Sequence, residues 1–282
     1  MEKSSNFSRP RHFGFSMCIA AAASLSMLFS CQDLSNPKEG DSATIAAGDT
    51  EFEMIYVAPG EFRMGATAEQ KGTDPNEVPA HDVKLTKGYW IGKLEVSQQQ
   101  WEAVMGSNPS LYKGEEGKEN KSLPVNGITW AQAQEFVKKL SELSGQTFRL
   151  PTEAEWEFAA RGGHKADGLM YSGSIYVENV ACCARNSGGV MAEVGRYMPN
   201  KLELRDMSGN VAELVADNYT LFKDSVYTDP LIVTSDTLDH VAKGGSFIKG
   251  QDFCRTSSRE GINPQSKLVN VGLRVVMEGV GN

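Results

Sequence analysis

The chain has 282 residues, of which 40% are hydrophobic and 23% are charged, and its formal net charge is −8. This composition is typical of a globular protein with one large domain or two small ones. The acidic balance argues against nucleic acid as a partner, because phosphate contacts need clustered Lys and Arg. The 28 glycines favour a loop-rich fold, since glycine adopts backbone angles that other residues avoid.

The first 30 residues show the three-part pattern of a secretory signal peptide. A basic, polar start is followed by the apolar run FSMCIAAAASLSMLF at 15–29, which is too short for a transmembrane helix. The end of this run, LFSC, resembles the lipobox of bacterial lipoproteins, which would make Cys31 the lipidated first residue of the mature chain. The alternative is a plain signal peptide with a chance cysteine. We favour the lipoprotein because signal and cysteine coincide in register.

Residues 31–50 have low hydrophobicity and many small or polar side chains, so we expect a flexible tether before one domain over residues 51–282. Three cysteines follow Cys31. They are Cys182, Cys183 and Cys254. A compartment outside the cytoplasm permits disulfides, and an odd number leaves at least one thiol unpaired. Vicinal pairing is sterically awkward, and a bridge from either vicinal cysteine to Cys254 stays open.

The first predicted elements are strands. Residues 52–65, FEMIYVAPGEFRMG, alternate apolar and polar side chains around Pro59-Gly60, which is typical of a β-hairpin. Residues 83–96 predict a second strand pair or one long strand. Residues 106–124 are charged and rich in glycine, so we expect a surface loop there.

Three capping boxes predict helices, because each pairs a Ser or Thr with a Gln three residues later or, in the last case, a Glu. The boxes are Ser97 with Gln100, Thr129 with Gln132, and Thr152 with Glu155. The second helix has an apolar face at helical spacing and ends at Gly145, and the third ends at Gly162. The predicted apolar face comprises Ala133, Phe136, Val137, Leu140 and Leu143. After the third helix we expect mostly loop and short strand.

The segment RLPTEAEWEFAARGG at 149–163 resembles the hallmark of the formylglycine-generating enzyme (sulfatase-modifying factor) domain family. Further segments resemble that family in the same order between residues 52 and 278. They include MIYVAPGEFRMG, KGYWIGKLEVSQQQWEAVMG, LPVNGITWAQAQEFVKKLSELSG, MSGNVAELVAD, AKGGSF and VGLRVV. The resemblance implies an α+β fold, the formylglycine-generating-enzyme-like variant of the C-type lectin fold, with few regular elements.

In oxidase members of that family, two cysteines bind copper(I), and oxygen is used to convert a cysteine of a sulfatase peptide to formylglycine. The positions that resemble those cysteines here are Lys249 and Cys254, so one thiol is missing. Copper(I) is soft and is held by thiolates, which argues against Cu(I) as a cofactor. Ser246 resembles a serine of the family's active site. Relatives usually carry Trp where this chain has Ala212 and Leu214, which weakens the expectation that a peptide binds as in the oxidases.

Two interpretations of Cys254 stay open. Lys249 would lower the pKa of its thiol and make it reactive, or Cys254 is buried as a small hydrophobic residue, which we favour. A further alternative is that Cys182 or Cys183 supplies the missing sulfur. The histidines at 81, 164 and 240 have no metal-ligand spacing and support neither an iron centre nor a Ser-His-Asp hydrolase.

The resemblance also implies a structural calcium ion in DMSGNVAE at 206–213. Ca²⁺ needs several oxygen ligands on a chain that can bend. The ligands would be the Asp206 and Glu213 side chains and the Gly209 and Val211 carbonyls. The alternative is that the aspartate caps a turn and the glutamate is solvated. A second family calcium site would begin near Asn179 and Val180, without clearly aligned further ligands.

We therefore expect a lipoprotein of the bacterial cell envelope, anchored in the outer membrane through Cys31. It would lack copper oxidase activity and act in the binding or assembly of other envelope proteins, such as secretion machinery. Two alternatives remain. One is a copper-dependent oxidase that converts a cysteine of a sulfatase peptide to formylglycine. The other is a lectin-like module that binds a glycan or small ligand.

Overall fold

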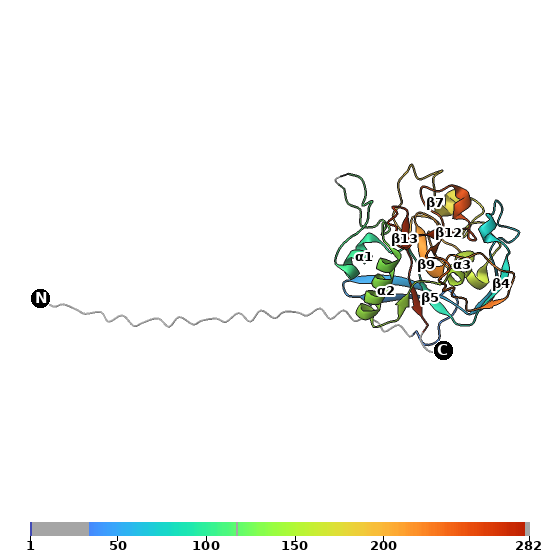
Figure 1. Cartoon of the computed structure of the whole chain (residues 1–282). Coiled ribbons are helices and arrows are strands. Elements are labelled where there is room, and N and C mark those ends of the chain that lie inside the picture. Colours follow the sequence, from blue (N-terminus) through green and yellow to red (C-terminus); the bar gives the residue numbers. More distant parts are fainter. Residues whose placement is uncertain (2–33, 117, 280–282) are drawn as a thin grey trace. The chain divides into compact units, whose positions relative to one another are not determined.

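The computed structural model describes residues 34–116 and 118–279, together with the first residue (Figure 1). The fold lies in the second of two units into which the chain divides, Asp33–Asn282. The predicted signal peptide over residues 1–30 and the predicted lipid attachment at Cys31 lie outside the described residues. Within the described part of the chain, no helix is long and apolar enough to cross a membrane.

The largest sheet has five strands, and every neighbouring pair in it is antiparallel. In spatial order the strands are β1 (Ser42–Ala47), β2 (Thr50–Val57), β5 (Tyr89–Gly92), β14 (Val276–Glu278) and β6 (Phe148–Arg149). Because β14 lies between β5 and β6, the last strand of the domain completes a sheet that the first strands began.

A four-stranded sheet contains β11, the strand that precedes the candidate site in the chain. Its order is β12 (Arg259–Ile262), β11 (His240–Lys243), β9 (Ala212–Asn218) and β13 (Val271–Leu273), with β9 and β13 parallel. The two smaller sheets are β10 (Tyr227–Thr228), β4 (His81–Leu85) and β3 (Gly60–Met64), and the parallel pair of β7 (Ala181–Cys182) and β8 (Ser208–Gly209).

All three predicted capping boxes are confirmed, with both reciprocal hydrogen bonds formed at each helix start. Each helix ends at a glycine in the left-handed conformation. The helices are α1 (Gln98–Met105), α2 (Trp130–Ser144) and α3 (Glu153–Arg161). Shorter turns are α4 (Val177–Val180) and the 3₁₀ segments η1 (Pro75–Glu77), η2 (Gly163–Lys165) and η3 (Gln251–Cys254). The predicted loop over 106–124 contains no helix or strand among its described residues.

The five-stranded sheet is covered on both faces, because successive residues of β2 belong to different hydrophobic clusters. Met54 and Tyr56 pack in the cluster that includes residues of α1 and α2. Ile55 and Val57 pack in the cluster of α3, around Trp156. In the view of Figure 1, α2 and α3 lie on opposite sides of β5. The core therefore has two layers, one on each face of this sheet.

The predicted hairpin over residues 52–65 is wrong. Its two halves form strands, but β2 pairs with β1 and β5, whereas β3 pairs with β4 in another sheet. The physical reason is visible in burial: the last four residues of β2 are buried, as in an interior strand, whereas β3 alternates and lies at an edge. Residues 83–96 likewise contain two strands, β4 and β5, that do not pair with each other.

The predicted tether over residues 31–50 is wrong for residues 39–50, because Glu39, Gly40 and Asp41 already hydrogen-bond to β2 or to the residue after it. β1 forms there and pairs in register with β2, with alternate side chains buried. Its small residues fit against the cluster of α1 and α2, so low hydrophobicity did not mean disorder. The apolar face predicted for α2 also ends early, because Leu143 in the last turn is exposed while the other four residues are buried.

Candidate functional site

The segment KGGSF at 243–247 leaves β11 through two glycines and runs beside Cys254. Gly244 and Gly245 have φ values of 89° and 69°, which favour glycine. A Cβ at Gly245 would lie 2.5 Å from the carbonyl oxygen of Phe253, so the close approach of these backbones requires glycine. This approach directs the backbone N–H of Ser246 at the Cys254 sulfur. The structure thus brings together the two residues that the sequence predicted for catalysis.

The side chain of Ser246 has another partner. Its hydroxyl is fully buried and accepts a hydrogen bond from Asn270 Nδ2 at 3.1 Å. The backbone of Ser246 therefore contacts the sulfur, while its side chain fixes the loop before β13.

Cys254 is fully buried, its thiol lies 3.9 Å from the Gly250 carbonyl oxygen, and Cys183 is a neighbour in the same buried cluster. Both belong to one hydrophobic cluster with Tyr171, Val177 and other residues around α4. The contact with Cys183, together with burial, raises the pKa of Cys254 well above its ordinary value. The favoured interpretation of Cys254 as a buried residue is confirmed, but the residue has a second sulfur beside it.

Cys183 has the opposite electrostatic environment. The neighbouring Cys254 side chain and the backbone N–H of Arg185 favour its thiolate form, while the Cys254 thiol itself donates to the Gly250 carbonyl at 3.9 Å. These groups outweigh burial and lower the pKa of Cys183 to about 6. The sequence had left Cys182 and Cys183 equivalent, and the structure separates them.

Cys182 lies on the other side of the chain, in a cluster with Leu123, Met191 and Phe247. Its thiol lies 3.6 Å from the carbonyl oxygen of Val190, and burial raises its pKa to about 11. The three cysteines are free. Cys182 ends β7 and Cys183 follows it, so these consecutive residues place their side chains in different clusters, and only Cys183 shares a cluster with Cys254.

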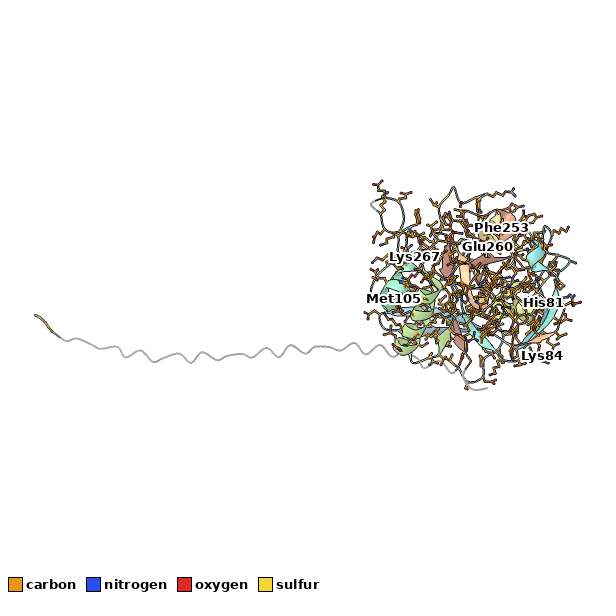
Figure 2. All side chains as sticks on the ribbon, in the orientation of Figure 1. His81, Lys84, Met105, Phe253, Glu260 and Lys267 are labelled. Atoms are coloured by element: carbon orange, nitrogen blue, oxygen red, sulfur yellow. The ribbon has the colours of Figure 1, made fainter. Side chains whose placement is uncertain are left out.

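The prediction that Lys249 lowers the pKa of Cys254 is wrong. The Lys249 ammonium lies 3.1 Å from Glu260 Oε1 and 4.8 Å from the ring centre of Phe253. Phe253 and Glu260 lie on the same side of the domain (Figure 2). The ammonium is thus neutralised at the rim of the site, and the Cys254 pKa is raised rather than lowered.

The predicted calcium ligands do not fit an ion in the arrangement that the structure shows. Both carboxylate oxygens of Glu213 are taken by Arg274, at 2.7 to 3.1 Å, and one also accepts from Trp156 Nε1 at 2.6 Å. A carboxylate neutralised by a guanidinium is a poor ligand for a hard cation. In this arrangement both oxygens of Glu213 are occupied by protein groups, and the residue is fully buried rather than solvated, so the alternative of a solvated glutamate is wrong.

Asp206 lies beside this ion pair and is also buried. One of its oxygens accepts a hydrogen bond from the backbone N–H of Gly195, and the other has no protein partner. Burial raises its pKa. Glu95, which sequence reasoning missed, completes the cluster and accepts from the Val211 N–H at 3.0 Å. A charged residue inside the apolar stretch before α1 was the signal for it.

The other predicted ligands are dispersed. The backbone N–H of Gly209 donates to the Gly244 carbonyl at 2.7 Å, which ties the predicted calcium turn to the KGGSF segment. Asn179 is exposed, and its carbonyl accepts from the Met198 N–H at 3.0 Å, while Val180 is buried beside the cysteines. Across residues 34–116 and 118–279, no group of three or more His, Cys, Asp or Glu side chains is arranged to hold a metal ion.

Two surface cavities are candidate binding sites for a ligand or a polypeptide. One, of about 630 Å³, is lined by Tyr171, Val177, Arg185 and Gln251 and lies next to the cysteine cluster. The other, of about 670 Å³, is a groove beside Trp130. The positions where relatives carry Trp, Ala212 and Leu214, belong to the hydrophobic core and line neither cavity.

Comparison with curated proteins finds both enzymes and a chaperone. The formylglycine-generating enzyme of Mycobacterium tuberculosis is 32% identical over 302 aligned residues, covering 81% of this chain and 98% of that protein. The protein named chaperone protein LppX of Paenibacillus barcinonensis is 31% identical over 226 residues, covering 62% of this chain and 75% of that protein. The similarity alone thus does not choose between catalysis and binding.

Solved structures agree on the fold. Treponema denticola variable protein 1 has a TM-score of 0.76 and 28% identity, and the alignment covers 86% of this chain and all of that one. PvdO from Pseudomonas aeruginosa has a TM-score of 0.75 at 22% identity, over the same 86% of this chain. The predicted α+β fold, the formylglycine-generating-enzyme-like variant of the C-type lectin fold, is confirmed. The sulfatase-modifying factor enzyme 1-like domain matches residues 41–279, and the chain therefore belongs to the formylglycine-generating-enzyme-like family.

Proposed function

We propose that the protein binds or assembles other polypeptides at the bacterial cell envelope and does not oxidise cysteine through copper. The observation that carries this proposal is Lys249. An ammonium, paired with Glu260, stands where the oxidases of the family have a copper-binding thiol. Copper(I) needs soft thiolate ligands, and a cation at one ligand position opposes a second cation.

A binding role is supported by the loop between β9 and β11. Five of its large apolar side chains are exposed, which is typical of an interaction surface. They are Leu221, Val226, Leu231, Val233 and Leu238. Hydrogen bonds from the loop backbone to side chains of β9 hold the loop in place. The Ile232 N–H donates to Asp217 Oδ1 at 2.9 Å, and the Thr234 N–H donates to Asn218 Oδ1 at 3.1 Å. An ordered loop that presents apolar residues fits a polypeptide client.

The groove beside Trp130 continues this surface, since Leu231 and Val233 line it. Arg149, Glu155 and Asp229 line it too, so the groove offers both charges beside apolar contacts. Such a surface suits an extended polypeptide better than a uniformly charged ligand. The similarity to a protein named as a chaperone supports the same proposal.

The envelope location is part of the proposal. It is supported by the signal pattern and by the lipobox-like LFSC, with Cys31 as the attachment point of the lipid. A domain anchored through a lipid on Cys31 would present its apolar loop to other proteins at the membrane surface. We propose the outer membrane as that surface.

Changing two loop residues tests the binding role. We expect the full chain with Leu231→Ser and Val233→Ser to bind a reduced, carboxymethylated and therefore unfolded protein about tenfold more weakly than the wild type, because apolar anchors supply most of the binding energy. Fluorescence anisotropy of the labelled client measures the dissociation constant. Leu143→Ser, which removes an equally apolar exposed side chain from α2, is the control and should bind as the wild type. Equal losses in both variants would contradict a role for this loop.

The second candidate function is a copper-dependent oxidase, and the contact of Cys183 with Cys254 favours it, because Cys183 could take the place of the missing thiol. We expect the copper(I)-loaded full chain to leave a Cys-x-Pro-x-Arg peptide unchanged in air, as judged by mass spectrometry. Conversion of the peptide cysteine to an aldehyde that is lost in Cys254→Ser would establish the oxidase instead.

A further inference from the structure

Two separate segments of the chain hold Cys183 and Cys254 against each other. Cys183 directly follows β7, and Cys254 ends η3. The backbone N–H of Ala184 donates to the Lys249 carbonyl at 2.9 Å, which ties the two segments together one residue beyond Cys183. The Ser208 hydroxyl donates to the Cys254 carbonyl at 2.8 Å from the strand that pairs with β7. The position of each sulfur is therefore set by the backbone of both segments.

The loop after Cys183 is shaped around this residue. Its backbone N–H donates to Asn186 Oδ1 at 2.8 Å, and its carbonyl accepts from the N–H groups of Asn186 and Ser187 at 3.0 and 2.9 Å. The loop holds Cys183 in place through its backbone and lowers the pKa of its thiol, and a cysteine with a lowered pKa is a better nucleophile near neutral pH. Cys182, one residue earlier, faces a different cluster, and its pKa is raised instead.

The cavity of about 630 Å³ gives access to this pair. Tyr171 and Val177 line the cavity and also pack in the cluster of the two cysteines, so one layer of side chains separates the thiols from the cavity. Arg185 Nη1 donates to Gln251 Oε1 at 3.1 Å, which joins the loop of Cys183 to η3 at the cavity wall. Both sulfurs are fully buried, so a small molecule in the cavity reaches them only when this layer of side chains moves aside.

We propose that Cys183 and Cys254 form a thiol–disulfide exchange pair for small organic disulfides that enter this cavity. The Cys183 thiolate attacks one sulfur of the disulfide R–S–S–R, forms a mixed disulfide and releases one RS⁻. Cys254 then loses its proton to a released thiolate and attacks the Cys183 sulfur. The Cys183–Cys254 bond forms, the bond to the second RS group breaks, and two protein thiols have been oxidised while R–S–S–R is reduced to two R–SH.

This proposal does not rest on the proposed function. It needs no metal, so copper oxidase chemistry and disulfide exchange are separated by working in the presence of a chelator. It also differs from the pair of positions that the family's oxidases use, because the partner of Cys254 is Cys183 and not residue 249.

The test uses the full chain carrying Cys182→Ser, so that the peptide of Cys183 holds one cysteine. The folded protein is incubated with oxidised glutathione and EDTA, freed of glutathione, unfolded in urea that contains iodoacetamide, and digested with trypsin. We expect a product in which the Cys183 peptide is linked to GQDFCR (250–255), two hydrogens lighter than the sum of the reduced peptides. We expect Cys254→Ser to accumulate glutathione on Cys183, and Cys183→Ser to keep Cys254 alkylatable.

The matched control is the wild type, in which Cys182 is present and should remain alkylatable. The proposal is overturned if Cys183 and Cys254 are both found alkylated after the folded Cys182→Ser protein has been treated in this way, under conditions that oxidise the same chain in urea. It is also overturned if Cys182 becomes linked in the wild type. Both results come from chains that retain the pair, so a variant that fails to fold does not decide the outcome.

Discussion

Replacing Arg274 by methionine is expected to lower the free energy of unfolding by about 3–5 kcal/mol, because it removes one partner of a buried ion pair. Arg274 is fully buried and binds both oxygens of Glu213. It also donates to the carbonyls of Gly92 and Arg205, each at 2.8 Å. Methionine keeps the apolar stem of the side chain but lacks the guanidinium, so the loss reports the charge and its hydrogen bonds together with the space that the guanidinium fills. Urea unfolding at pH 7 measures it.

The same substitution has a pH signature. Burial and the neighbouring carboxylates raise the pKa of Glu95 well above its ordinary value, while Arg274 opposes that rise. Without Arg274 these carboxylates bind protons more tightly in the folded than in the unfolded state. A raised pKa in the folded state contributes stability at low pH that is lost as the pH rises through that pKa. We therefore expect the deficit of Arg274→Met to be smallest near pH 4 and to grow towards pH 8.

An exposed ion pair provides the control. Lys84 lies 2.8 Å from Glu61 Oε1, and both side chains are more than half exposed. Lys84→Met should cost less than about 1 kcal/mol, because solvent screens such pairs. A deficit in Arg274→Met no larger than that of Lys84→Met would show that the carboxylate cluster does not depend on this guanidinium.

The helices could be predicted from the sequence because their signals are local. In each capping box, a hydroxyl and a Gln or Glu side chain bond to the backbone three residues away, so the necessary partners are adjacent in the chain. The pairing of strands is not local. Alternation in residues 52–65 predicted strands correctly, but β2 pairs with β1 before it and with the more distant β5 instead of with β3.

In the candidate site, too, features within one segment could be predicted, whereas contacts between distant segments could not. The family resemblance placed Ser246 and Cys254 in one segment, and the structure confirms that they meet. The family resemblance implied a calcium ion at 206–213, and it gave no sign that the charge opposite Glu213 is Arg274, 61 residues further along the chain. The separation of Cys182 from Cys183 depends on the loop after β7, which directs only the second towards η3. Contacts between distant segments determine these features, and such contacts cannot be predicted from local patterns in a single sequence.

Replacing Glu77 by glutamine is expected to cost about 3–5 kcal/mol of unfolding free energy, because Arg255 would stay buried without a countercharge. Glu77 is fully buried in η1 and accepts from both terminal nitrogens of Arg255 at 2.6 Å. Burial alone would raise the pKa of Glu77, and the bonds from Arg255, Asp74 and Ser257 bring it below its ordinary value. The wild type therefore loses this contribution as the pH falls through that lowered pKa, and Glu77→Gln should not.

The consequence for the site follows from chain order, since Arg255 is the residue after Cys254. The Glu77 contact anchors the end of η3 from a segment 178 residues earlier in the chain. We expect Glu77→Gln to increase the alkylation rate of Cys254 in the folded protein, measured by peptide mapping in dilute iodoacetamide. Glu260→Gln, which breaks the partly exposed pair with Lys249 near the start of the same turn, is the matched control and should cost less than about 1 kcal/mol. If both variants expose Cys254 equally, general loosening of the segment explains the effect. If only Glu77→Gln does, the buried pair holds the thiol in place.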